Sequence, residues 1–165
     1  MRIRLARAGA ACLLVTIIGT AGCSGATIDL ARTIKVGNLT TGWFDRGVVD
    51  GKNKLVPSAS FTVTNTGTAT LSGLQILSVF RFLGDAEELG SSFLVLHGPD
   101  ALAASATSKP LTVRANWGFT SEQPRAQMLM HKLFQDAQVE IFVKYGPAKY
   151  VKLTDAKVQR QLLTQ

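Results

Sequence analysis

The sequence predicts a mainly β fold, an antiparallel β-sandwich with one amphipathic helix near residues 124–135. Three observations predict it. Apolar and polar residues alternate along several short segments, turn-forming residues separate these segments, and no regular succession of strand and helix indicates a parallel sheet. A chain of 165 residues, 46% of them hydrophobic and 18% charged, is long enough for one domain with its own core. This composition excludes a disordered chain and a multispanning membrane protein.

The first two strands are expected over residues 28–36 and 59–63, where apolar and polar residues alternate. The second ends at residues 65–68, whose Asn-Thr-Gly-Thr composition is typical of a turn. Residues 74–83 are almost continuously apolar, which predicts a central strand covered on both faces, and a charged turn over residues 84–90 follows it. Further strands are expected over residues 92–97, 110–119, 138–145 and, after a tight Gly-Pro-Ala connection, 149–153.

The helix is predicted by apolar residues that recur at helical spacing: Ala126, Leu129, Met130, Leu133 and Phe134. Pro124 suits the first turn of this helix, and Ser121 can cap it. Such a stripe is typical of core packing, so the helix is expected to cover the sandwich as a lid. A short second helix is expected over residues 155–163.

The first 22 residues have the pattern of a secretory signal peptide. A positive start with Arg2, Arg4 and Arg7 precedes an apolar stretch over residues 8–18 and small residues over 19–22. The apolar stretch is shorter than the ~20 residues that a membrane-spanning helix needs. Residues 1–22 are therefore expected to be an export signal, followed by a single sandwich domain over residues 27–165.

Thr20-Ala21-Gly22-Cys23 resembles the lipobox of bacterial lipoproteins, although Thr20 stands where Leu is usual. The resemblance implies that the Cys23 thiol carries a diacylglycerol, that cleavage precedes Cys23, and that its new amino group is acylated. Two or three acyl chains hold a protein stably on a bilayer. Ser24 resembles the outer-membrane class, which implies an outer-membrane protein facing the periplasm if the host has two membranes. Residues 23–26 would then form a short tether, and no internal disulfide is expected.

The body also resembles a known class of domains. Phe61-Thr62-Val63-Thr64-Asn65-Thr66-Gly67 is followed by a long apolar segment that ends in an acidic turn, and residues 102–113 lead into another strand. This layout is similar to the immunoglobulin-like domains of bacterial envelope proteins, in particular those of the FxLYD type, over roughly residues 58–145. The resemblance implies an immunoglobulin-like sandwich and assigns no function.

The charge pattern argues against nucleic acid as a partner. The chain has 18 basic and 11 acidic residues, and the three early arginines account for part of the excess, so the body has 15 basic and 11 acidic residues. No basic stripe is interleaved with aromatic residues. The C-terminal basic residues indicate either a solvated sheet edge or a contact with anionic lipid; they are Lys144, Lys149, Lys152, Lys157 and Arg160.

The histidines and acidic residues of the sequence match no known catalytic or metal-binding motif. The sequence therefore predicts a protein that is not an enzyme and has no cofactor and no metal. His97 and His131 are the two histidines, and no Gly-x-Ser-x-Gly motif accompanies them. Acidic residues over 85–88, or at 45 and 50 beside Asn53, match no ordered calcium loop.

The candidate recognition surface is Trp43, Phe44 and Arg46, in an expected connection that runs to residue 56. Two adjacent aromatics cannot both point inward along a regular strand, and exposed Trp with Arg is typical of recognition hot spots. The alternative is that Trp43 plugs one end of the sandwich and Phe44 covers its edge. Trp117 and Phe119 are expected to lie on one face of one strand, in the core.

Three functions follow from these patterns. The first is a lipid-anchored binding or scaffolding module, not an enzyme, whose partners are the bilayer through acylated Cys23 and another envelope protein. The second is a carrier or sensor of apolar ligands, with the helix as the gate of a cavity. The third is an envelope hydrolase, which the missing constellation disfavours.

Overall fold

The computed structural model describes residues 28–163 of the chain. The expected signal peptide over residues 1–22, Cys23 and the tether over residues 23–26 lie outside the described residues. Within residues 28–163, no helix is both long enough and apolar enough to span a membrane.

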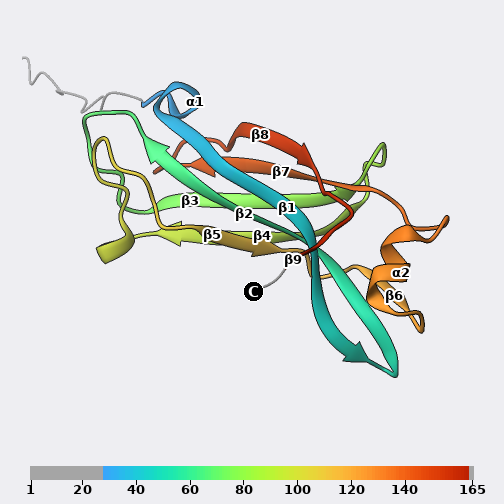
Figure 1. The fold of residues 1–165 in the computed structure, drawn as a ribbon. Coiled ribbons are helices and arrows are strands. Elements are labelled where there is room, and N and C mark those ends of the chain that lie inside the picture. The colour runs from blue at the N-terminus through green and yellow to red at the C-terminus, as the bar shows by residue number, and fades with distance from the viewer. Residues whose placement is uncertain (1–27, 164–165) are drawn as a thin grey trace, which may run out of the picture.

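The described chain is mainly β, as predicted, and its strands form two stacked sheets (Figure 1). The first sheet has the order β5-β2-β1-β9, and β6 also pairs with β2. Its strands are β1 (Ile34–Val49), β2 (Lys52–Asn65), β5 (Leu111–Arg114), β6 (Phe119–Ser121) and β9 (Leu162–Leu163). The second sheet has the order β4-β3-β7-β8, made of β3 (Leu74–Phe82), β4 (Glu88–Leu96), β7 (Ala137–Lys144) and β8 (Val151–Lys157). All neighbours pair antiparallel except β1 and β9.

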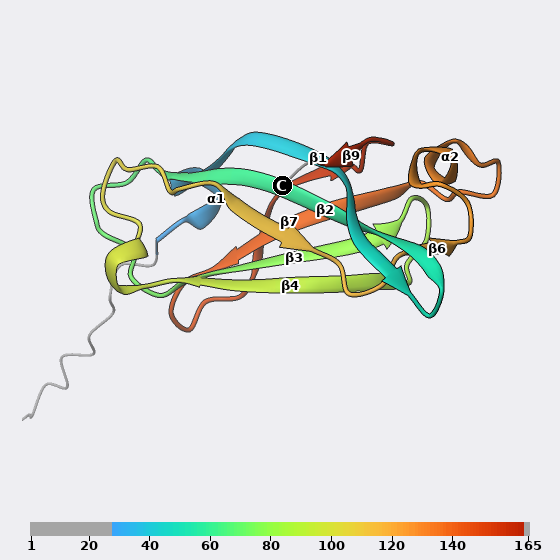
Figure 2. The same ribbon diagram turned by 60° about the horizontal axis from the view of Figure 1, so that its bottom comes forward.

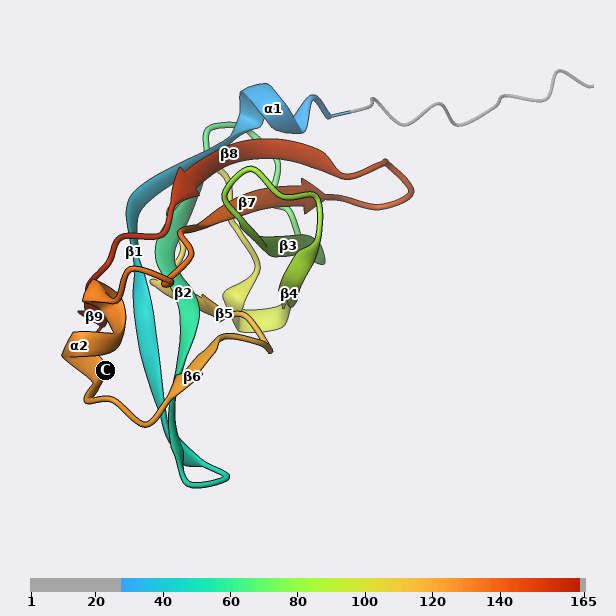
Figure 3. The same cartoon turned by 90° about the vertical axis from the view of Figure 1, so that its right-hand side faces the viewer.

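β1 and β2 form one long hairpin, which differs from the connection expected over residues 41–56. Val49 pairs with Lys52, so Asp50 and Gly51 alone make the turn, with φ angles of 51° and 77°. An Asp-Gly pair with two positive φ angles is the favoured two-residue hairpin turn. The tip of this hairpin extends beyond the stacked sheets (Figures 1 and 3). The Asp50-Gly51 signal was therefore sufficient to predict the hairpin.

The N-terminal strand begins later than expected, because a helical turn precedes it. The turn is α1 (Leu30–Thr33), and the Asp29 side chain caps it by accepting a hydrogen bond from the Arg32 N–H at 3.3 Å. The strand expected over residues 28–36 was wrong over residues 28–33, since an aspartate cap outweighs the local alternation of apolar residues.

The predicted helix is present but short: α2 (Arg125–Met130) replaces the expected span of residues 124–135. His131 adopts an extended conformation and ends it, and Ser121 accepts from the Gln123 N–H instead of capping the helix. Leu129 of the predicted stripe is buried, whereas Met130 is 81% exposed. The helix expected over residues 155–163 was wrong, because that stretch contains the end of β8 and the short β9.

The core lies between the two sheets, where alternate side chains of β2, β3 and β7 face each other. Its largest fully buried members include Phe61, Phe80, Ile76, Ile141 and Leu55. β3 lies between β4 and β7, which confirms it as a central strand, but it is not fully covered on both faces, since Gln75, Leu77 and Arg81 are only half-buried. Figure 2 shows the two layers and the 3-10 turn η1 (Gly98–Asp100) that follows β4.

The strand expected over residues 110–119 is interrupted, which corrects the position of Trp117. Residues 115–118 leave β5 and bring Gly118 against the first sheet, where an added Cβ would lie 2.0 Å from the Leu55 carbonyl oxygen. Trp117 is consequently 69% exposed instead of lying in the core. Phe119 is partly buried and packs against the core, as predicted.

Candidate functional site

The aromatic pair of the predicted recognition surface is buried, so these rings do not form a recognition surface. Trp43 is 1% exposed and meets the ring of Phe134 edge to face, with centroids 4.5 Å apart. Phe44 is covered by the Arg114 guanidinium, whose central carbon lies 3.5 Å from the ring centroid. Arg46 alone is exposed. This arrangement matches the alternative in which Trp43 plugs the sandwich, and it is fixed by the later segment that supplies Phe134.

The titratable residues considered for chemistry lie apart and are used structurally. His97 follows β4 and contacts the Val95 carbonyl, and the Nδ1 of His131 accepts from the Leu133 N–H at 3.2 Å. Asp45 is paired with Arg125, and this hydrogen bond holds the pKa of the Asp45 carboxyl below its ordinary value. Across residues 28–163, no group of three or more His, Cys, Asp or Glu side chains converges for a metal ion.

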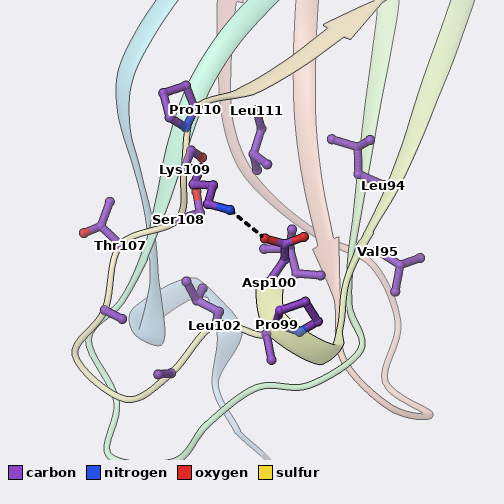
Figure 4. A pocket seen from close by; sticks show the side chains of 14 residues that line it. Leu94, Val95, Pro99, Asp100, Leu102, Thr107, Ser108, Lys109, Pro110 and Leu111 are labelled. Atoms are coloured by element: carbon purple, nitrogen blue, oxygen red, sulfur yellow. Dashed lines mark hydrogen bonds and ion pairs between the residues drawn. The ribbon is translucent and has the colours of Figure 1, made fainter.

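A concavity lies on the open side of the sandwich, between the edge strands β4 and β5. It has a volume of about 510 Å³ and is lined by residues 94–96, 99–103 and 106–111 (Figure 4). Leu94 and Leu96 of β4 form one wall, while Leu102 and Leu111 form the other. We call this concavity the β4–β5 groove. Because the sheets are not joined by hydrogen bonds on this side, their apolar inner faces reach the surface here.

The mouth of the β4–β5 groove is polar. Lys109 Nζ lies 3.5 Å from Asp100 Oδ1 across it, and both side chains are largely exposed (Figure 4). The Ser108 hydroxyl accepts from the Val63 N–H at 3.0 Å and donates to the Lys109 carbonyl at 2.8 Å, which fixes the backbone of this wall. An exposed ion pair contributes ~0–1 kcal/mol, so it closes the mouth only weakly.

A buried amide holds the loop that forms the outer wall of the groove. Asn65 is 0% exposed, and its Nδ2 donates to the carbonyls of Ala69, Leu102 and Ala103 at 2.8, 3.2 and 3.1 Å. Its Oδ1 accepts from the Gly67 N–H at 2.9 Å. The turn predicted at residues 65–68 therefore also positions a distant loop, which a local sequence pattern does not indicate.

The edge of β4 beside the groove carries neither a charge nor a proline that would protect it from pairing with another strand. Residues 90–96, Gly-Ser-Ser-Phe-Leu-Val-Leu, contain neither a charge nor a proline, and Phe93 and Val95 are 54% and 38% exposed. Two other edge strands are protected: β8 carries Lys152 and Lys157, and β5 is four residues long and follows a proline. An open, uncharged edge is a template for pairing with another strand.

Sequence reasoning missed this edge, although a signal was present. The sequence predicts a strand over residues 92–97, and this stretch contains no charged residue. A sequence does not say, however, which strands lie at the edge of a sheet.

A second set of exposed apolar side chains belongs to elements at the other end of the sandwich. They are Val48, Val49, Trp117, Met130 and Leu133. They come from the hairpin tip, the segment before β6 and the region of α2, and Figure 1 shows the tip, β6 and α2 at the same end of the sandwich. Lys54 Nζ lies 5.7 Å from the Trp117 ring.

Acidic residues at the C-terminal strands form ion pairs that join elements. Asp136 lies 2.7 Å from both Lys157 Nζ and Arg160 Nε, and these hydrogen bonds hold the pKa of Asp136 below its ordinary value. Arg160 also donates to the Leu129 and Phe134 carbonyls at 3.3 and 2.9 Å. This cluster attaches residues 157–160 to the region of α2, so Lys157 and Arg160 have a structural role.

The interior beneath α2 is filled. Phe134 packs against both Trp43 and Phe119, with centroids 4.5 and 5.0 Å apart, and Met128 is completely buried. The β4–β5 groove contains no residue of α2. A carrier gated by this helix therefore receives no support from the packing.

No family model matches the chain, and no curated protein does. Among solved structures, the solution structure of AT1g01470 from Arabidopsis thaliana is 14% identical, covers 81% of this chain and 83% of that one, and has a TM-score of 0.45. The Northeast Structural Genomics Consortium target SoR45 is 11% identical over 78% and 88% of the two chains, with a TM-score of 0.36. A protein from Archaeoglobus fulgidus is 13% identical over 78% and 100%, with a TM-score of 0.38. These similarities transfer no function to this chain.

Proposed function

We propose that this chain is a lipid-anchored binding module of the cell envelope that recognises another envelope protein. The anchor is Cys23, at the end of a signal-like segment that resembles a lipobox. Its place in the envelope is the outer membrane, facing the periplasm, if the host has two membranes. The module is not an enzyme and binds neither nucleic acid nor a cofactor.

One observation carries the binding role: an open, uncharged strand edge lies beside an apolar groove. The β4 edge offers unpaired backbone groups, and the adjoining groove of about 510 Å³ offers contacts for apolar side chains. This volume falls within the ~300–1,000 Å³ of typical ligand sites. Backbone groups and apolar contacts together suit a protein ligand better than a small polar molecule.

We also propose that the sandwich is immunoglobulin-like. The strand order supports this proposal. In immunoglobulin domains a sheet of strands C, F and G carries C′ at its edge, and strands A, B and E form the opposite sheet. The order β4-β3-β7-β8 corresponds to C′-C-F-G, and β1, β2 and β5 correspond to A, B and E.

In-cell photo-crosslinking tests the binding role. A photoreactive residue at Phe93, on the free edge, is expected to capture one envelope protein, identified by mass spectrometry and reproduced with the purified pair. Tyr150 is the matched control, since it is an aromatic residue of comparable exposure, 38%, beside β8. The same captured protein from both positions, or none from Phe93, would overturn the proposed binding role.

A further inference from the structure

We propose that the β4 edge binds an extended, uncharged peptide segment with apolar side chains at alternate positions, which adds a strand to the second sheet. This inference rests on the proposed binding function and names the chemistry of its ligand. It places the peptide backbone along residues 91–96 and every second peptide side chain over the β4–β5 groove.

The backbone of β4 supplies the first half of the site. β4 pairs with β3 alone, so its other side presents N–H and C=O groups of alternate residues. The first residues are already covered, because the Trp117 N–H donates to the Leu89 carbonyl at 3.2 Å. The free part runs over residues 91–96 and ends at η1. At ~3.4 Å per residue it spans roughly 20 Å.

The side chains beside this edge supply the second half. Successive residues of a strand point to opposite faces, so a strand added next to β4 alternates in the same way. Its inward side chains lie over Leu94 and Leu96, opposite Leu102 and Leu111 of the groove. Its outward side chains lie beside Phe93, which is 54% exposed. The groove side therefore favours apolar side chains at every second position of the peptide.

The peptide side chains over the groove are expected to be uncharged because the free edge carries no charge to pair with them. Residues 90–96 carry none, and the two charged groups at the groove mouth, Lys109 and Asp100, already pair with each other. A charged side chain over the groove would lose its hydration without compensation.

A peptide fits the free edge better than a second copy of this chain or a lipid. Residues 115–118 and η1 flank the free edge, which leaves six residues, 91–96, for pairing. Stable interfaces between folded domains use about 20–30 residues on each side. The excess of basic residues in the body, 15 against 11 acidic residues, also opposes self-association. An acyl chain could fill the groove but would leave the backbone groups of the edge unpaired.

The test uses the full chain, purified in detergent micelles, and a dye-labelled, end-capped peptide of about eight alternating Val and Thr residues. Fluorescence anisotropy is expected to show saturable binding in the micromolar range, and hydrogen exchange is expected to slow within residues 91–96. The decisive comparison is the same peptide with N-methyl groups on the amides that face β4. It cannot donate these hydrogen bonds and is expected to bind at least about tenfold more weakly.

A variant pair provides an independent measurement. Phe93→Lys places a charge on the free edge and is expected to weaken peptide binding about tenfold or more. Tyr150→Lys, a matched exposed aromatic near β8, is expected to leave binding unchanged. Because the N-methylated peptide needs no substitution, misfolding of a variant does not affect the main comparison.

Each contrary result overturns the inference. Equal binding of the N-methylated peptide, or protection outside β4, would exclude strand addition at this edge. If, in the absence of peptide, the protection of residues 91–96 from hydrogen exchange increases with protein concentration, the occupant is a second copy of the chain. Displacement of the peptide by free fatty acid, with no change in amide exchange, would identify a lipid.

The two proposals fail separately. Peptide binding in vitro does not require acylation, so Cys23→Ser should bind the peptide as the parent does. If the peptide binds but Phe93 captures no envelope protein, the strand-addition site stands and the proposed envelope function is wrong. If Phe93 captures an envelope protein but the peptide does not bind, the proposed envelope function stands and the strand-addition site is wrong.

Discussion

The indole of Trp43 lies edge-on to the ring of Phe134, with centroids 4.5 Å apart and planes inclined by 68°. The pair joins β1 to the segment after α2, although 91 positions separate the two residues in the chain. Trp43, predicted as part of a recognition surface, is therefore a buried residue of the core. The free energy of unfolding should therefore depend strongly on Trp43.

Trp43→Ala should lower the free energy of unfolding by about 3–5 kcal/mol, because it removes a large, fully buried ring and leaves a cavity. Urea unfolding followed by circular dichroism measures this change. Trp117→Ala is the control, since its side chain is 69% exposed, and should stay within about 0.5 kcal/mol of the parent. Equal losses for both tryptophans would contradict the burial described here.

Asn65→Ala should lower the free energy of unfolding by about 2–3 kcal/mol, because carbonyls of Leu102 and Ala103 lose their buried donor. Asn65→Asp should be at least as destabilising at neutral pH, since an ionised carboxylate is an acceptor only and would face those carbonyls. Both variants should speed hydrogen exchange in residues 102–103. Asn116→Ala, at an exposed position, should leave exchange there unchanged, and a similar change in that variant would argue against the role of Asn65.

Gly118→Ala should destabilise the protein by about 1–3 kcal/mol, because its Cβ would clash with the backbone of Leu55 and Val56. The local result should be detachment of β6, visible as faster hydrogen exchange at residues 119–121. Gly37→Ala is a milder control, since its nearest neighbour is the Thr62 hydroxyl oxygen at 3.2 Å. A Gly118→Ala variant as stable as the parent would exclude this close approach.

Stability should fall on acidification partly through Asp136. Hydrogen bonds from Lys157 and Arg160 hold its pKa below the ordinary value of 3.8, so the folded state binds a proton less readily than the unfolded state. The contribution is complete above the unfolded pKa, near pH 4, and is lost as the pH falls through the lowered folded pKa. Denaturant unfolding between pH 5 and pH 2 should show a shallower decline for Asp136→Asn than for the parent.

Asp50→Asn is the matched control for that measurement. Asp50 lies at the exposed hairpin tip and makes no ion pair within residues 28–163. Its variant should retain the full acid dependence of the parent. If the free energy of unfolding of Asp136→Asn falls with pH as steeply as that of Asp50→Asn, the Asp136 ion pairs do not contribute to the pH dependence.

Cys23→Ser should abolish incorporation of labelled fatty acid and move the protein out of the membrane fraction, because the acyl chains hold it there. Cys12→Ala, within the expected signal peptide, should change neither result. Radiolabelling and membrane fractionation of both variants measure the outcome. Continued labelling of Cys23→Ser would rule out the lipid anchor.

Local patterns predicted the strands that lie inside the sheets. β3 and β7 lie where continuous or alternating apolar residues placed them, because burial on a sheet face imposes a period of two on the sequence. The α1 turn and the Asp50-Gly51 hairpin are also encoded locally, in an aspartate cap and a two-residue turn.

The sequence by itself determined the mainly β class and most strands, and it predicts a signal peptide over residues 1–22 that precedes Cys23. The tertiary structure alone decided that Trp43 is buried, that Trp117 is exposed and that β4 has a free edge. The physical reason is that strand periodicity is a local property, whereas an edge and a groove depend on which distant strands pair. Phe134 covers Trp43, and the loop held by Asn65 forms the groove wall, through contacts that no short pattern contains.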